Sequence, residues 1–112
     1  MELISVQNKI YTIRNQQVML DFDSAEMYGV ETKRLNEQVK RNIQRFPIDF
    51  MFQLTNNEFD SLRSQFATSK RGGKRYLPYV FTEQGVAMLS GILNSETAIN
   101  VNIAIMRAFV AI

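Results

Sequence analysis

Apolar residues recur at helical spacing in the middle of the chain, between residues 23 and 46. At about 100° per residue, four of them share one stripe of a helix: Leu35, Val39, Ile43 and Phe46. The opposite arc is polar and mostly basic. It consists of Lys33, Arg34, Glu37, Lys40, Arg41, Gln44 and Arg45. One side of this helix is therefore expected to pack on a core, while the other side faces solvent.

The residues before this helix predict a helix-turn-helix. Asp23 is placed to cap a short first helix, and Glu26 is placed to reach back to the backbone N–H of that cap. Gly29 supplies the left-handed turn between the two helices. Two positions depart from the pattern, because Ser24 and Gln38 stand where apolar residues are usual.

Strand-like segments lie on both sides of the helical pair. Residues 10–14 and 17–20 alternate in the manner of strands and predict a β-hairpin that turns at Asn15 and Gln16. The aromatic-rich run of residues 50–54 predicts a buried strand.

A third helix is predicted over residues 57–65, with Thr55 or Asn56 as its N-cap. Three apolar residues at helical spacing form its inner face: Phe59, Leu62 and Phe66. These phenylalanines are expected to belong to the core.

A basic stretch with paired glycines follows at residues 67–75. Gly72 and Gly73 predict the tip of a second β-hairpin, because glycine accepts the positive φ that tight hairpin turns require. The next segment, YLPYVF, contains Pro78, which has no N–H to donate to a sheet. We therefore expect this strand to be bulged or to lie at a sheet edge.

Two helices end the chain. Thr82 caps a predicted helix over residues 83–93, and Asn94 or Ser95 begins the last one. The last helix is apolar on two opposite sides, one with Ile99, Ile103, Met106 and Val110 and the other with Val101, Ile105, Ala108 and Ile112. Such a helix is expected to be buried on both sides, either as the central helix of the domain or as a homodimer contact through residues 95–112. Because the sequence stops within this helix, we expect residues 1–112 to be the N-terminal part of a longer protein.

Composition narrows the possible chemistry. A chain of 112 residues predicts one domain. The chain contains no cysteine and no histidine, so the usual transition-metal ligands and the commonest general base are missing. It has no phosphate-binding glycine loop, and its carboxylates are scattered. We expect a protein without enzymatic activity, cofactor or metal, and no membrane span, since no apolar run approaches about 20 residues.

The charge is strongly segregated, although the chain as a whole carries only +2. Residues 33–45 and 70–75 hold nine of the thirteen basic residues and one of the eleven acids. These two segments therefore carry a net +8, which leaves −6 for the remainder of the chain. A local positive field of this kind attracts a polyanion.

A basic helix after a helix-turn-helix, together with a basic hairpin, is typical of winged-helix proteins that bind double-stranded DNA. With the helix of residues 32–46 in a major groove, its N-terminal part would meet base edges. The candidate base contacts are Thr32, Lys33, Arg34, Asn36 and Glu37. The candidate phosphate contacts are Lys40, Arg41, Arg45, Lys70, Arg71, Lys74 and Arg75, with Gly72 and Gly73 at the tip of loop 69–75.

Other interpretations stay open at the level of the sequence. The basic helix could be an ordinary solvated face. The domain could instead be a protein-interaction or oligomerisation module whose basic face binds an acidic protein partner. A third possibility is single-stranded nucleic acid, which would stack on Tyr76 and Tyr79 beside the basic loop.

Longer phrases of the sequence resemble a known family. QQVMLDFDSAEMYGVETKRLNEQVKRNIQRFPIDFMFQLT, RYLPYVFTEQGVAMLSGIL and NIAIMRAF are similar to the phage ORF-six-N domain, a relative of the KilA-N and Bro-N domains, over about residues 9–110. The resemblance implies an N-terminal DNA-binding module of phage or prophage regulatory proteins, often attached to a C-terminal domain of antirepressor type. It implies a cytoplasmic protein of the bacterial host. Ser24 departs from the leucine that the family resemblance leads us to expect.

From pattern and resemblance together we expect an α+β fold. It would be a small single domain with a helix-turn-helix or winged-helix-like core, an N-terminal β-hairpin, a basic Gly-Gly hairpin and C-terminal helices.

Overall fold

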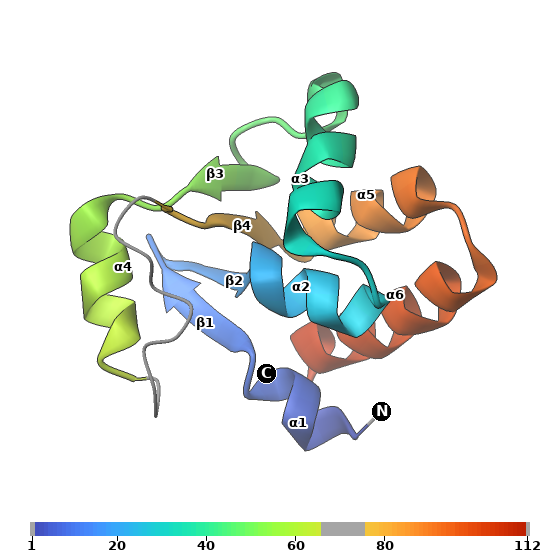
Figure 1. The fold of residues 1–112 in the computed structure, drawn as a ribbon. Coiled ribbons are helices and arrows are strands. Elements are labelled where there is room, and N and C mark those ends of the chain that lie inside the picture. The colour runs from blue at the N-terminus through green and yellow to red at the C-terminus, as the bar shows by residue number, and fades with distance from the viewer. Residues whose placement is uncertain (1, 66–75, 112) are drawn as a thin grey trace.

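The structure is a computed structural model that describes residues 2–65 and 76–111. Helices and strands are mixed along these residues (Figure 1). In chain order the elements are α1 (Leu3–Gln7), β1 (Ile10–Ile13), β2 (Gln16–Leu20), α2 (Asp21–Tyr28), α3 (Thr32–Arg41), the 3-10 helix η1 (Ile43–Arg45), β3 (Met51–Gln53), α4 (Asn56–Arg63), β4 (Tyr79–Thr82), α5 (Glu83–Leu93) and α6 (Glu96–Val110).

The strands form one antiparallel sheet in the order β1-β2-β4-β3. Successive strand residues point to opposite faces, and apolar side chains cover both faces here. On one face, the cross-strand partners Met19 and Phe81 join a core with residues of α1, α2, α3, α5 and α6. On the other face, Val18 and Val80 pack with residues of α4 (Figure 1). This arrangement confirms the predicted α+β class.

The N-terminal hairpin is confirmed, with its turn one residue earlier than predicted. Arg14 and Asn15 both have positive φ, 54° and 61°, so they form the two-residue turn and Gln16 already belongs to β2. Arg14 is an unusual residue at positive φ. Its guanidinium donates to both carboxylate oxygens of Glu58 at 2.7 and 3.0 Å and lies 4.2 Å from the ring centroid of Phe52. These contacts attach the turn to α4 and β3.

The expectation of an edge or bulged strand around Pro78 is wrong. β4 lies inside the sheet, between β2 and β3. Pro78 comes one residue before the strand, so its missing N–H is never required in the ladder. Its carbonyl still accepts from the backbone N–H of Leu54 at 2.9 Å.

The predicted cap of the first helix is also wrong. β2 ends at Leu20 and α2 begins at Asp21, so Leu20 is the N-cap residue and no side chain caps the helix. Asp23 instead lies in the first turn, where an acid is stabilised by the helix dipole. Ser24 is fully buried, and its hydroxyl donates to the carbonyl of Leu20 at 3.0 Å. The unexpected serine is therefore hydrogen-bonded within its own helix.

The long helix of the prediction ends early. α3 stops at Arg41, because Asn42 leaves the helical region with φ −123° and its side chain donates to the carbonyl of Gln38 at 2.8 Å. This break turns Ile43 outward, where it is 53% exposed, against the prediction that it belongs to the core stripe. Leu35, Val39 and Phe46 are buried as predicted.

Three side-chain caps are confirmed. Thr55 accepts from the N–H of Glu58 at 3.1 Å, and Glu58 accepts from the N–H of Thr55 at 2.8 Å, which completes a capping box for α4. Thr82 caps α5 and Ser95 caps α6. The residues that these caps position, including Phe59 of α4, are buried in the core.

The last helix is buried on one side rather than two. Val101, Ile105 and Ala108 of α6 are buried, which leaves the opposite stripe to solvent. In that stripe Ile99 is 53%, Ile103 44% and Val110 75% exposed. The expectation of burial on both sides is thus wrong within this chain. Ile112, Phe66 and the predicted hairpin of residues 67–75 lie outside the described residues.

Candidate nucleic-acid interface

A short turn places α3 on the surface. Gly29 closes α2 in the left-handed conformation with φ 72°, as the sequence predicts. Its N–H donates to Glu26 at 3.2 Å, and the N–H of Val30 donates to Ala25 at 3.0 Å. The chain therefore leaves α2 sharply and enters α3 at Thr32. Whether this pair is a DNA-binding helix-turn-helix stays a prediction.

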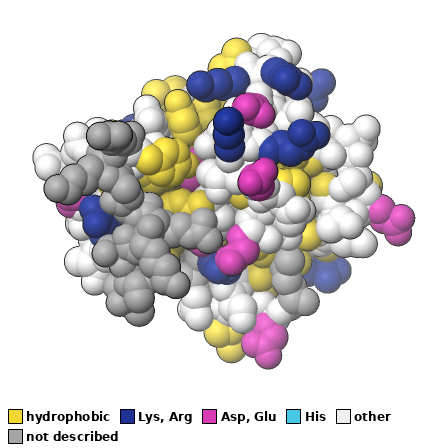
Figure 2. Space-filling model, in the orientation of Figure 1, with side chains coloured by type: hydrophobic (Ala, Val, Ile, Leu, Met, Phe, Trp, Pro, Cys, Tyr) yellow, Lys and Arg dark blue, Asp and Glu magenta, His cyan; other side chains and the backbone are white. Residues whose placement is uncertain are grey.

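The polar arc of α3 and η1 is exposed throughout, as its spacing predicts. We call this surface the α3 basic face; it comprises Lys33, Arg34, Glu37, Lys40, Arg41, Gln44 and Arg45. Figure 2 shows dark blue Lys and Arg side chains gathered over α3, with few acids between them. None of the ion pairs between described residues involves the five cations of this face. Their charge is therefore free to attract an anion.

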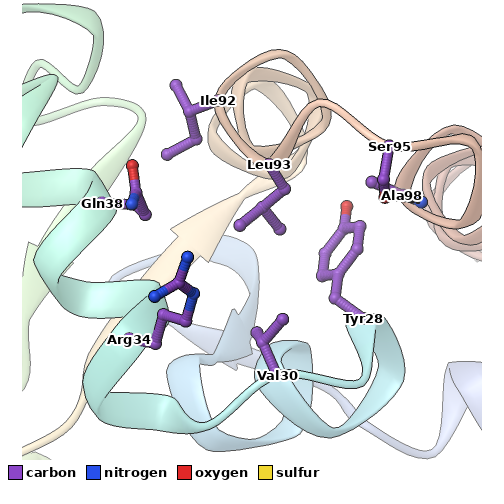
Figure 3. Close-up of a pocket in the computed structure, with 8 residues that line it drawn as sticks. All are labelled: Tyr28, Val30, Arg34, Gln38, Ile92, Leu93, Ser95 and Ala98. Atoms are coloured by element: carbon purple, nitrogen blue, oxygen red, sulfur yellow. Dashed lines mark hydrogen bonds between the residues drawn. The ribbon is translucent and has the colours of Figure 1, made fainter.

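One flank of α3 faces a small pocket. Arg34 and Gln38 point toward Ile92 and Leu93 at the end of α5 (Figure 3). The pocket has a volume of about 170 Å³. Tyr28 also lines the pocket, its hydroxyl accepts from Asn102 at 2.9 Å, and burial raises its pKa to about 12. Arg34 thus lies at the rim between the basic face and this pocket.

The other flank of α3 holds Asn36, whose side chain is already engaged. Its Nδ2 donates to Oδ2 of Asp21 at 2.9 Å, and Asn36 is only partly exposed. Asp21 itself is fully buried, and its Oδ2 also accepts from the hydroxyl of Tyr76 and from the backbone N–H of Tyr79 at 3.1 Å. Burial raises the pKa of Asp21, while these hydrogen bonds oppose that rise.

Sequence reasoning missed the importance of Asp21. It stands close to Asp23 and Glu26, which makes it resemble one more acid near a helix N-terminus. The available signal was its position between Leu20 and Phe22. An acid that is flanked by core residues at a strand end is expected to have a buried side chain.

The second half of the predicted site lies outside the described residues. Lys70, Arg71, Gly72, Gly73, Lys74 and Arg75 all fall there. Their convergence with the α3 basic face therefore stays a prediction.

Metal sites and membrane spans can also be sought in the described residues. In residues 2–65 and 76–111, no group of three or more acids lies close enough together to hold a metal ion. No helix in the same part of the chain is both long and apolar enough to span a membrane.

Comparison with known proteins identifies one family. The family model of the ORF6N domain matches residues 8–92, which is most of the 112-residue chain. This match confirms the resemblance to the ORF-six-N domain. No curated protein and no solved structure gives a significant match.

Proposed function

The chain belongs to the ORF6N domain family, and from that premise we propose that it binds double-stranded DNA without catalysis. The family fits a regulatory protein of a phage or prophage. The proposed role is that of an antirepressor-type regulator acting in the cytoplasm of a bacterial host. A C-terminal regulatory domain would complete it.

The exposed α3 basic face is the observation that supports DNA binding most directly. Four cations and one acid lie on one side of α3, which packs on α2 and α5, and Arg45 of η1 adds a fifth exposed cation (Figures 1 and 2). A major groove about 12 Å wide admits such a helix. In this pose Lys33, Arg34 and Glu37 reach base edges, while Lys40 and Arg41 meet phosphates.

The remaining predicted contacts belong to the same proposal. Loop 69–75 would bind the DNA backbone, in addition to the contacts made by α3. Its residues would add phosphate contacts to those of Arg45.

A salt titration tests the proposal. Fluorescence anisotropy with a mixed-sequence duplex should give a log affinity that falls linearly with log salt, with a slope of about 0.9 per phosphate contacted. Lys40→Glu and Arg41→Glu should each weaken binding to all sequences alike and reduce that slope by about one unit. Arg63→Glu is the charge-matched control, because Arg63 lies on α4. Reversals on α3 with no more effect than the control would refute the DNA-binding surface.

We also propose that the exposed stripe of α6 forms a homodimer contact. Ile99, Ile103, Met106 and Val110 are spaced four, three and four residues apart, the spacing of a coiled-coil seam. Three of them are large apolar residues left exposed. Ile103→Glu should convert a dimer into a monomer in sedimentation equilibrium. A wild-type protein that is monomeric at high concentration would refute this contact.

The rival function is binding of an acidic protein through the same basic face. Purified protein that retains nucleic acid, seen as raised absorbance at 260 nm and lost in high salt, favours the DNA function. In the third interpretation, Tyr76 and Tyr79 stack on single-stranded bases. Competition between duplex and single strands distinguishes it from duplex binding. In the structure, Tyr76 already donates its hydroxyl to Asp21.

A further inference from the structure

A buried carboxyl connects α3 to the sheet. Asp21 is the first residue of α2, and its side chain is fully buried. One of its oxygens, Oδ2, accepts from Asn36 of α3, from the backbone of Tyr79 at the start of β4 and from the hydroxyl of Tyr76. Donors from separate parts of the chain therefore meet at a single atom.

In the described part of the chain, two oxygens of this cluster are buried without a hydrogen bond of ordinary geometry, Oδ1 of Asp21 and Oδ1 of Asn36. No ion pair between described residues includes Asp21. Burying a carboxyl in this way is unfavourable, and the hydrogen bonds to Oδ2 offset part of that cost.

The apolar stripe that packs α3 against α2 and α5 is narrow, because only Leu35 and Val39 of this helix are buried. A rotation of about 20° moves a side chain by roughly 2 Å at the outer radius of a helix, which is about 5–6 Å. Hydrogen bonds to bases tolerate a range of only about 0.5 Å. A lateral contact that restricts the rotation therefore favours base recognition.

We propose that Asp21 is a positioning residue for DNA recognition, and that it fixes the rotation of α3 by holding Asn36. Asn36 then belongs to the scaffold of the interface instead of reading a base. The same carboxyl fixes Tyr76, which follows directly after Arg75, the last cation of the basic segment. This inference rests on the proposed DNA-binding function.

The sign of the effect distinguishes positioning from charge. Removing an acid near a DNA-binding surface should tighten binding if charge alone matters. Positioning predicts the reverse: Asp21→Ala should weaken duplex binding on the order of tenfold, the scale of one hydrogen bond to a charged group. Asn36→Ala should weaken it similarly. The double variant should be no weaker than either single variant, because both remove the same contact.

A conservative substitution and a remote control complete the experiment. Asp21→Asn keeps an acceptor for Asn36 and replaces one carboxylate oxygen with an amide donor, so its affinity should stay within about twofold of wild type. Thr55→Ala removes the capping box of α4 on the other face of the sheet, and should leave affinity per folded molecule unchanged. Affinity in Asp21→Ala equal to or tighter than wild type would overturn the proposal, as would additive effects of the two alanine variants.

Hydrogen exchange tests the same inference without DNA. The backbone amides of residues 35–41 should exchange about tenfold faster in Asp21→Ala than in wild type, and at the wild-type rate in Thr55→Ala. A wild type that fails to bind any duplex overturns the proposed function, while the exchange rates still decide whether Asp21 holds α3. Unchanged exchange in Asp21→Ala would overturn the positioning role.

Discussion

Gly85 lies where the structure leaves no room for a side chain. A Cβ at this position would sit 2.0 Å from the carbonyl oxygen of Phe50 and 3.3 Å from Cβ of Phe81. The Phe50 oxygen cannot simply move aside, because it accepts from the backbone N–H of Thr82 at 3.0 Å and from its hydroxyl at 3.3 Å. Gly85→Ala therefore forces α5 away from the end of β3.

The cost follows from two opposing terms. Overpacking of a core costs about 3 kcal/mol at the upper end of its usual range, and a contact with backbone belongs there. Replacing glycine by alanine in a helix returns about 0.5–1 kcal/mol. We expect Gly85→Ala to lose about 2–3 kcal/mol from a total unfolding free energy of about 5–15 kcal/mol. The melting temperature should fall by roughly 10–20 °C.

A second glycine of the same helix provides the matched control. A Cβ at Gly91 would meet only a terminal nitrogen of Arg45, at 4.0 Å, and Gly91 is exposed. Gly91→Ala should therefore stabilise the protein by about 0.5–1 kcal/mol. Urea denaturation of the two variants should give midpoint shifts of opposite sign with unchanged m-values. A Gly85→Ala variant as stable as wild type would refute the close approach of α5 to Phe50.

Two further predictions concern pH. Arg14 lowers the pKa of Glu58 to about 2 from an ordinary 4.5. This pair therefore contributes stability above pH 4.5 and loses it as the pH falls toward 2. In acid titrations followed by circular dichroism, the stability difference between wild type and Glu58→Gln should shrink over that range. Burial raises the pKa of Asp21. Its contribution is therefore fully present below its unfolded pKa and lost as the pH rises through the folded one, so Asp21→Asn should gain stability relative to wild type as the pH rises above the ordinary pKa of 3.8. A pH-independent difference would contradict either assignment.

Local signals in the sequence predicted much of the fold. Thr55, Thr82 and Ser95 cap their helices because a hydroxyl and the N–H it accepts from lie within three residues of each other. Gly29 ends α2 for an equally local reason. The exposure of the polar residues of α3 up to Arg41 follows from helical spacing.

Some of the errors come from contacts that are distant in the sequence, and one comes from a local helix break. No residue near Pro78 indicates that β2 and β3 flank the next strand, β4. The predicted edge position of β4 was therefore wrong. Ile43 turns outward because Asn42 breaks the helix through its bond to Gln38. The partners of Asp21 lie far along the chain, which is why its role required the structure.

The central place of β4 has a consequence for how the protein is made. Val18 of β2 pairs with Thr82, and Phe52 of β3 pairs with Val80. Both strands therefore need the later segment β4 before their pairing in the sheet is complete. A nascent chain on the ribosome holds β2 and β3 with open edges until residues 79–82 emerge. Distant pairings of this kind slow folding and expose strand edges meanwhile. Translation products that stop before residue 79 should therefore aggregate instead of forming a partial domain.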